Sequence, residues 1–118
     1  MQAVFITATD TGVGKTTVSA GLAKVLLNRG LKVGYYKPVE TGVEDYPQDG
    51  KLLSQITGQP LEEVVLYTYK NPLAPYPASL IEGKEVDIDK IVQHFRYLQS
   101  KCDFLIVEGA GGVYVPIT

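Results

Sequence analysis

The chain has 118 residues, 45% of them hydrophobic, which is enough for one compact core and too few for two domains of ordinary size. Eleven basic and thirteen acidic residues give a formal net charge of -2, so no broad basic surface is expected to hold nucleic acid or an anionic membrane. One cysteine excludes an internal disulfide, and neither a signal segment nor an apolar run of ~20 residues is found, so we expect a cytoplasmic protein.

The first half of the chain has the pattern of a strand, a helix and a second strand. A short β-favouring run predicts a buried strand over residues 3–8. Apolar residues at helical spacing predict a helix over residues 16–29, which ends before Gly30, and residues 31–36 form the second strand. A strand, helix and strand of these lengths require a right-handed parallel crossover. The expected apolar stripe of the helix is Val18, Leu22, Val25 and Leu26.

The middle of the chain gives weaker signals. Residues 39–85 are rich in Pro, Gly and Tyr, which favours loops over long regular elements. A short helix is predicted over residues 50–57, with less marked helical segments at 61–65 and 78–82.

The last third predicts one helix and one strand. Asp87 is the expected N-cap of a helix that ends before Lys101, and His94 lies off its apolar stripe, where we expect an ordinary surface residue. A third buried strand is predicted over residues 104–107, before a glycine-rich turn. The expected stripe residues are Ile88, Ile91, Val92, Phe95 and Leu98.

A phosphate-binding loop is predicted at residues 9–16, because the sequence Thr-Asp-Thr-Gly-Val-Gly-Lys-Thr lies between a strand and a helix. Loop amides can surround a β-phosphate, Lys15 can bridge β- and γ-phosphate oxygens, and the Thr16 hydroxyl can ligate Mg²⁺. Thr9 replaces the first glycine of the strict pattern. The other interpretation, a glycine-rich turn beside a surface lysine, fits these flanks less well. The expected nucleotide-binding residues are Gly12, Val13, Gly14, Lys15, Thr16 and Thr17.

These elements predict an α/β fold of the P-loop NTPase kind, with three layers α/β/α and a mostly parallel sheet. Glu108 ends the third strand, which places a carboxylate at the C-terminal edge of the sheet as a candidate Mg²⁺ ligand or a solvated glutamate. Asp49 precedes the short helix and suits either a metal carboxylate or an N-cap. Lys37 ends the second strand, where a cation can hold a γ-phosphate or a substrate carboxylate, and its position alone leaves that role open.

The chain resembles dethiobiotin synthetase in the order and spacing of several segments. They are the loop at 9–16, Gly-Tyr-Tyr-Lys-Pro-Val-Glu-Thr-Gly at 34–42, Asn71-Pro72, and Val-Glu-Gly-Ala-Gly-Gly at 107–112 with Pro116. The loop is shared with related P-loop ATPases, so only the combination carries the resemblance. Ala8 stands where the family often has Gly, and Gly12 where a carboxylate can occur. Family members continue well beyond this length, so residues 1–118 are expected to be a single nucleotide-binding domain truncated at its C-terminal end.

The resemblance implies ATP-dependent carboxylation and ring closure of 7,8-diaminononanoate with CO₂, through a carbamate and a carbamic-phosphoric anhydride. The products are dethiobiotin, ADP and phosphate. It also implies ATP as co-substrate, Mg²⁺ as cofactor and a homodimer. The residues that it implies are Lys15, Lys37 and Thr11 for catalysis, Thr11, Lys37 and Thr41 for substrate, and Thr16, Asp49 and Glu108 for the metal.

Three other interpretations stay open at this point. A partitioning-type P-loop ATPase switch usually carries an extra lysine near the start of the loop, where this chain has Asp10. An amidotransferase-type cobyrinate or cobyric acid synthase shares the loop but needs a glutaminase part. A catalytically silent phosphate-binding fragment would bind ATP without closing a ring.

Overall fold

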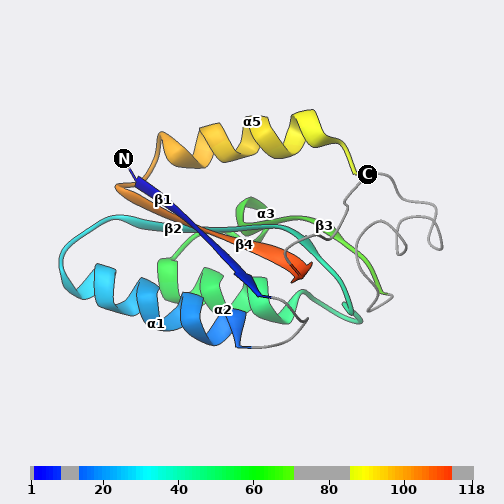
Figure 1. Ribbon diagram of the computed structural model, residues 1–118, viewed down its shortest axis with the longest axis horizontal. Helices are drawn as coiled ribbons and strands as arrows, with labels where there is room; N and C mark the ends of the chain where they lie inside the picture. Colours follow the sequence, from blue (N-terminus) through cyan, green and yellow to red (C-terminus); the bar gives the residue numbers. More distant parts are fainter. Residues whose placement is uncertain (1, 9–13, 71–85, 113–118) are drawn as a thin grey trace.

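A four-stranded parallel sheet lies between two layers of helices in the computed structural model, which describes residues 2–8, 14–70 and 86–112 (Figure 1). The strands follow the order β1-β4-β2-β3, with β1 (Gln2–Ala8), β2 (Val33–Glu40), β3 (Val65–Thr68) and β4 (Phe104–Gly112). One face of the sheet is covered by α1 (Lys15–Asn28) and α2 (Gln48–Thr57), and the other by α5 (Ile88–Gln99). The predicted three-layer α/β fold with a parallel sheet is confirmed.

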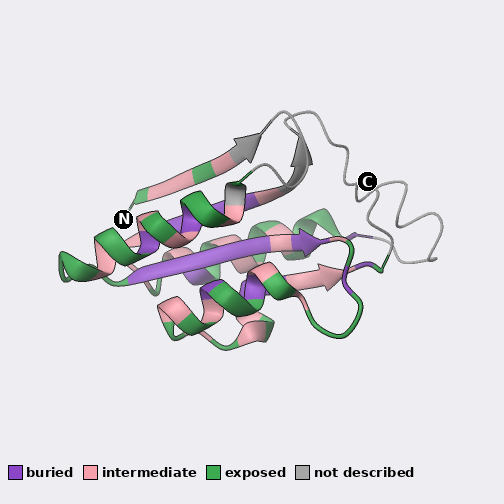
Figure 2. Ribbon diagram, turned by 90° about the horizontal axis from the view of Figure 1, so that it is seen from below, coloured by how far each residue is buried: buried purple, intermediate pink, exposed green. Residues whose placement is uncertain are grey.

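The two central strands, β2 and β4, carry the core. Residues alternate between the faces of a strand, so Tyr35 and Ile106 pack toward α1 and α2, whereas Tyr36 and Val107 pack toward α5. Figure 2 shows β2 buried along nearly its whole length. Burial on both faces explains why these strands have nearly continuous apolar runs.

The structure adds one strand that the sequence did not predict. A single helical turn, α3 (Leu61–Val64), ends directly at β3, a four-residue strand at one side of the sheet. The sequence suggested a helix over residues 61–65, and the four residues of β3, one buried and three half-buried, are too few to show a strand period. The helical segment suggested at 78–82 and the Asn71-Pro72 pair lie outside the described residues.

Both predicted long helices form, but their buried stripes are narrower than expected. In α1, Val18 and Val25 are 55% and 50% exposed, and the small side chains of Ser19 and Ala23 are fully buried instead. Small residues allow a helix to approach the sheet closely, which moves the contact face away from the larger apolar residues. In the part of the chain that the structure describes, no helix combines the length and apolar content needed to cross a membrane.

The beginning of α5 follows the sequence prediction, while one of its side chains does not. The Asp87 carboxylate accepts hydrogen bonds from the backbone N–H groups of Asp89 and Lys90, so it is the N-cap. His94 is not an ordinary surface residue, because Nε2 lies 2.6 Å from the Glu63 carbonyl oxygen and its ring contacts Tyr36. Ile88 and Val92 are exposed, which leaves the other three stripe residues to pack on the sheet.

Candidate functional site

Strands β2 and β4 bring a lysine and a glutamate together. Both residues lie within their strands, which continue to Glu40 and Gly112, so the prediction that Lys37 and Glu108 end these strands is wrong. Tyr36 pairs with Val107, so Lys37 and Glu108 are the next residues along two neighbouring strands. Lys37 Nζ donates to Glu108 Oε2 at 2.9 Å and to Asp49 Oδ2 at 2.9 Å. The side chain of Glu108 is fully buried and that of Lys37 is 7% exposed. Removing one member of such a buried pair would leave an uncompensated charge.

Helix α1 supplies two hydroxyl groups to the same glutamate. Thr16 and Ser19 are three residues apart, which places both on one face of the helix. Thr16 Oγ1 donates to Glu108 Oε2 at 3.1 Å, and Ser19 Oγ donates to Glu108 Oε1 at 3.0 Å. Both carboxylate oxygens of Glu108 are therefore held from the phosphate-loop helix.

Helix α2 brings Asp49 to the site, and Glu40 from β2 holds the start of this helix. The helix begins at Gln48 with Pro47 as its N-cap, so the alternative in which Asp49 is the N-cap is wrong. The backbone N–H groups of Asp49 and Gly50 donate to the two carboxylate oxygens of Glu40 at 3.2 and 3.0 Å. The Asp49 side chain is thereby free to face Lys37.

The phosphate-loop residues within the described range lie at the same edge of the sheet. Gly14 is the N-cap of α1 with φ of 66°, a left-handed conformation that glycine adopts without strain. Lys15 is the first residue of α1, and Thr17 is exposed on the first turn. The amide groups of this turn and the positive end of the helix dipole suit an anion. Of the other predicted nucleotide-binding and catalytic residues, Thr11, Gly12 and Val13 lie outside the described residues.

Thr41 directly follows β2 and is partly buried. The contacts that join Lys37, Asp49, Glu108 and Thr16 do not include it. The structure therefore places Thr41 next to the end of a site strand but not within the group of contacting side chains.

The charges at this edge favour a cation. Burial by itself lowers the pKa of Lys37, but the charges and hydrogen bonds of Glu108 and then Asp49 outweigh it, so the pKa is raised and Lys37 stays protonated at neutral pH. Burial raises the pKa of Glu40, and the Gly50 N–H opposes that shift. Among the described side chains of this cluster, the carboxylates of Asp49 and Glu108 contact one ammonium group, and Glu40 adds a third carboxylate nearby. The excess of negative charge is what a divalent cation would neutralise.

The donor set fits Mg²⁺ by its chemistry. Thr16, Asp49 and Glu108 offer one hydroxyl and two carboxylates, all of them hard oxygen ligands of the kind that Mg²⁺ takes while keeping several waters. Across residues 2–8, 14–70 and 86–112, no group of three or more His, Cys, Asp or Glu residues is arranged to hold a metal ion by itself. A metal here would need the threonine hydroxyl and phosphate oxygens in addition to the carboxylates.

Sequence reasoning missed three buried polar residues of the site. They are Ser19, which contacts Glu108, Glu40, which caps α2, and Tyr35, whose hydroxyl is buried beside Glu108. The spacing from Thr16 to Ser19 was a usable signal, because it places a second hydroxyl on the same helix face. The other two depend on contacts between elements that no local pattern reveals.

Comparisons with known proteins identify the family and several relatives of this chain. Residues 2–118 match the family described as AAA domain. The chain is 52% identical over 114 residues to the ATP-dependent dethiobiotin synthetase BioD of Aquifex aeolicus, and 47% identical over 114 residues to that of Hydrogenobaculum sp.. It is 40% identical over 121 residues to the protein of the same name from Bacillus subtilis.

These alignments cover nearly all of this chain and about half of each relative. The coverage is 97% of this chain for the first two relatives and 99% for the third, against 52% of each relative. The chain thus spans about half the length of the curated relatives that it matches, and the family resemblance predicted from the sequence motifs is confirmed.

Proposed function

We propose that this chain, which belongs to the AAA domain family, carries the ATP- and magnesium-binding part of a dethiobiotin synthetase. The observation that carries the proposal is the convergence of Lys37, Asp49, Glu108 and Thr16 beside the first turn of α1, the helix that follows the C-terminal edge of β1. Ligands of open α/β sheets bind at this edge. The name of these relatives adds the reaction class, a synthetase that depends on ATP.

In this proposal, residues 12–17 bind the phosphates of ATP through loop and helix amides, with Lys15 on the β- and γ-phosphates. Thr16, Asp49 and Glu108 hold Mg²⁺, which neutralises phosphate charge when it is bound. The buried contacts of Glu108 with α1 and β2 would fix its carboxylate, so that this ligand need not be ordered during binding.

The proposed reaction closes a ureido ring on 7,8-diaminononanoate. One amine adds to CO₂ to form a carbamate, and a carbamate oxygen takes the γ-phosphoryl group of ATP, which releases ADP. The second amine then attacks the carbamic-phosphoric anhydride at carbon, loses a proton and expels phosphate. Lys37, Lys15 and Thr11 would stabilise the charge that develops on the transferred groups, and Thr11, Lys37 and Thr41 would contact the substrate.

Four coarser properties belong to the same proposal. Residues 1–118 would form one nucleotide-binding domain of a homodimeric, cytoplasmic enzyme that acts on small molecules. Sedimentation of the protein at several concentrations would test the dimer, and a monomer at every concentration would contradict it.

The test is phosphate release that depends on ATP, Mg²⁺ and bicarbonate, measured with and without 7,8-diaminononanoate. It should be run on this chain and on a fusion in which the chain replaces the matching half of the Aquifex aeolicus relative. We expect the diamine to trigger phosphate release and dethiobiotin formation by the fusion. ATP binding with no ring closure by the fusion would support the silent phosphate-binding alternative instead.

Two lysine variants make this test specific. Lys37→Met should lower the diamine-dependent rate by about 10²–10³-fold, the usual effect of losing a group that stabilises transition-state charge. Lys51→Met is the control, because Lys51 lies on the exposed side of α2 over Tyr46 and has no contact with the site. Equal rates for the two variants would contradict the role of Lys37.

A further inference from the structure

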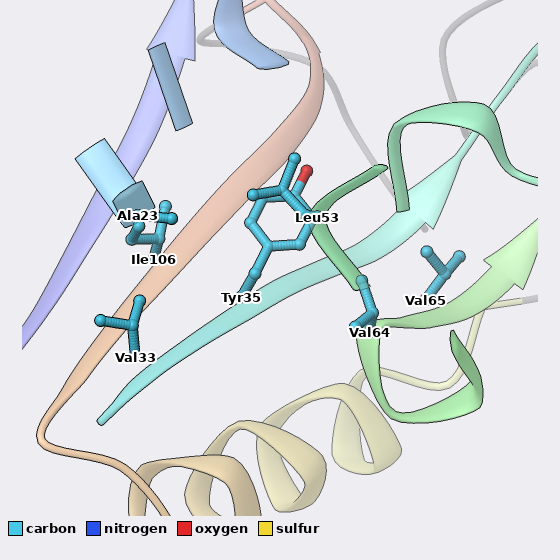
Figure 3. Close-up of a cluster of buried hydrophobic side chains, with 7 residues drawn as sticks. All are labelled: Ala23, Val33, Tyr35, Leu53, Val64, Val65 and Ile106. Carbon is cyan, nitrogen blue, oxygen red and sulfur yellow. The ribbon is translucent and has the colours of Figure 1, made fainter. Parts of the chain in front are cut away.

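One buried hydroxyl at the site has no role in the proposed reaction. Tyr35 is fully buried, and its hydroxyl has no hydrogen-bond partner among the described residues. Figure 3 shows its ring rising from β2 among Leu53, Ala23 and Ile106, with the oxygen pointing away from the strand. A buried hydroxyl without a partner is unfavourable, so a native structure that keeps one needs an explanation.

The Glu108 carboxylate lies on the same face of the sheet as this hydroxyl, because Tyr35 pairs with Ile106 and Glu108 is two residues further along β4. Tyr35 and Lys37 are two residues apart on β2, so both lie on the face of the sheet where Glu108 meets α1. Burial and then the negative charge of Glu108 raise the pKa of the Tyr35 hydroxyl, so the carboxylate lies near it. Among the described residues, this hydroxyl is left without a hydrogen bond. A carboxylate has about four acceptor positions, and Ser19, Thr16 and Lys37 use three of them.

We propose that Tyr35 is a positioning residue, whose hydroxyl donates to Glu108 and, with Ser19, fixes this carboxylate as a metal ligand. This inference rests on the proposed function. When the site is loaded, the Thr16 hydroxyl would bind the metal and Lys37 would bind the phosphoryl group. Neither would then still donate to Glu108 Oε2. Ser19 and Tyr35 would then be the two hydroxyl donors that hold the carboxylate in place.

The chemistry of the two residues suits this task. Burial, followed by the charge of Glu108, raises the pKa of Tyr35, so its hydroxyl stays protonated and donates to a carboxylate rather than competing with it for the metal. Groups that hydrogen-bond a metal ligand orient it, and their loss weakens metal binding without changing the ligand itself.

The neighbouring tyrosine provides a matched control. Tyr36 is also buried on β2, but it lies on the opposite face of the sheet, where its hydroxyl donates to the Ile91 carbonyl oxygen at 2.9 Å. Tyr35→Phe and Tyr36→Phe therefore each remove one buried hydroxyl, and only the first of them faces Glu108.

The experiment measures Mn²⁺ affinity by electron paramagnetic resonance at saturating ADP for the wild type and both variants. We expect Tyr35→Phe to weaken Mn²⁺ binding by about 10–100-fold and Tyr36→Phe to leave it within twofold. Ser19→Ala is a second variant with the same expectation, which keeps the proposal testable should Tyr35→Phe not fold.

The other outcomes separate the two proposals. Wild-type affinity in Tyr35→Phe, together with a higher midpoint of thermal unfolding, would show that the hydroxyl is only an unpaired group in the core and would overturn the inference alone. An equal loss in both Phe variants would overturn it as well. Absence of Mn²⁺ binding by the wild type would overturn both the inference and the proposed function.

Discussion

Glu40 shows how a single side chain sets the position of a site residue. The first amides of a helix have no partner within the helix, and Pro47 offers no side-chain oxygen to α2. Glu40, the last residue of β2, accepts hydrogen bonds from two of these amides. Its side chain is buried, with 5% of the residue exposed. The link joins the strand that carries Lys37 to the helix that carries Asp49.

We predict that Glu40→Ala lowers the free energy of unfolding by about 1–2 kcal/mol, the usual cost of losing a helix cap. Urea unfolding followed by circular dichroism measures this change. Glu44→Ala is the control, since Glu44 is exposed in the loop that follows β2. A midpoint for Glu40→Ala equal to that of the control would show that α2 does not need this cap.

The sequence placed the candidate metal ligands better than it placed their supports. The predicted elements placed Thr16 at the start of a helix, Asp49 just before one and Glu108 at the end of a strand, and parallel strands bring their C-terminal ends to one edge. In the structure all three residues lie inside α1, α2 and β4. Tyr35 had the pattern of a buried strand residue, and Glu40 lay in the segment predicted to favour loops, because the importance of both comes from groups on other elements. Such contacts between distant segments leave no local pattern.

At the scale of elements, the close packing of α2 on β3 depends on a glycine. Gly50 is buried in the first turn of α2, and a Cβ atom there would overlap the Val65 side chain. Glycine is unfavourable inside a helix, but here it allows the backbone of α2 to lie close to the Val65 side chain. The approach keeps Asp49 near the end of β2.

Gly50→Ala should destabilise the protein by about 1–3 kcal/mol, because overpacking exceeds the gain in helix propensity. Gly21→Ala is the matched control: it lies within α1 with open space around its Cβ position, and we expect a gain of up to about 1 kcal/mol. The two midpoints of thermal unfolding should therefore move in opposite directions. A stabilised Gly50→Ala variant would contradict the described packing.

Most of the described elements could be predicted from local sequence patterns, and only β3 among them depends on packing. The helical period identified α1 and α5, and apolar runs identified β1, β2 and β4. It did not identify β3, because this strand is short and is defined by pairing with β2 and packing against Gly50. Tertiary contacts, rather than local preference, make these four residues a strand.

At the scale of the whole molecule, the order β1-β4-β2-β3 creates the site. It places β4 between the strand that precedes the phosphate loop and the strand that carries Lys37. Glu108 of β4 is therefore reached from α1 on one side and from β2 on the other. A parallel sheet was predictable from the crossovers, but its strand order was not, since the sequence motifs carry no information on which strands pair.

The central claim is that Thr16, Asp49 and Glu108 form one metal site, and Mn²⁺ titration of an Asp49→Asn variant at saturating ADP tests it most directly. Asp45→Asn is the control, because Asp45 is an exposed carboxylate in the loop before α2. We predict at least about 10-fold weaker Mn²⁺ binding for Asp49→Asn and no change for the control. Wild-type Mn²⁺ affinity in Asp49→Asn would contradict the claim.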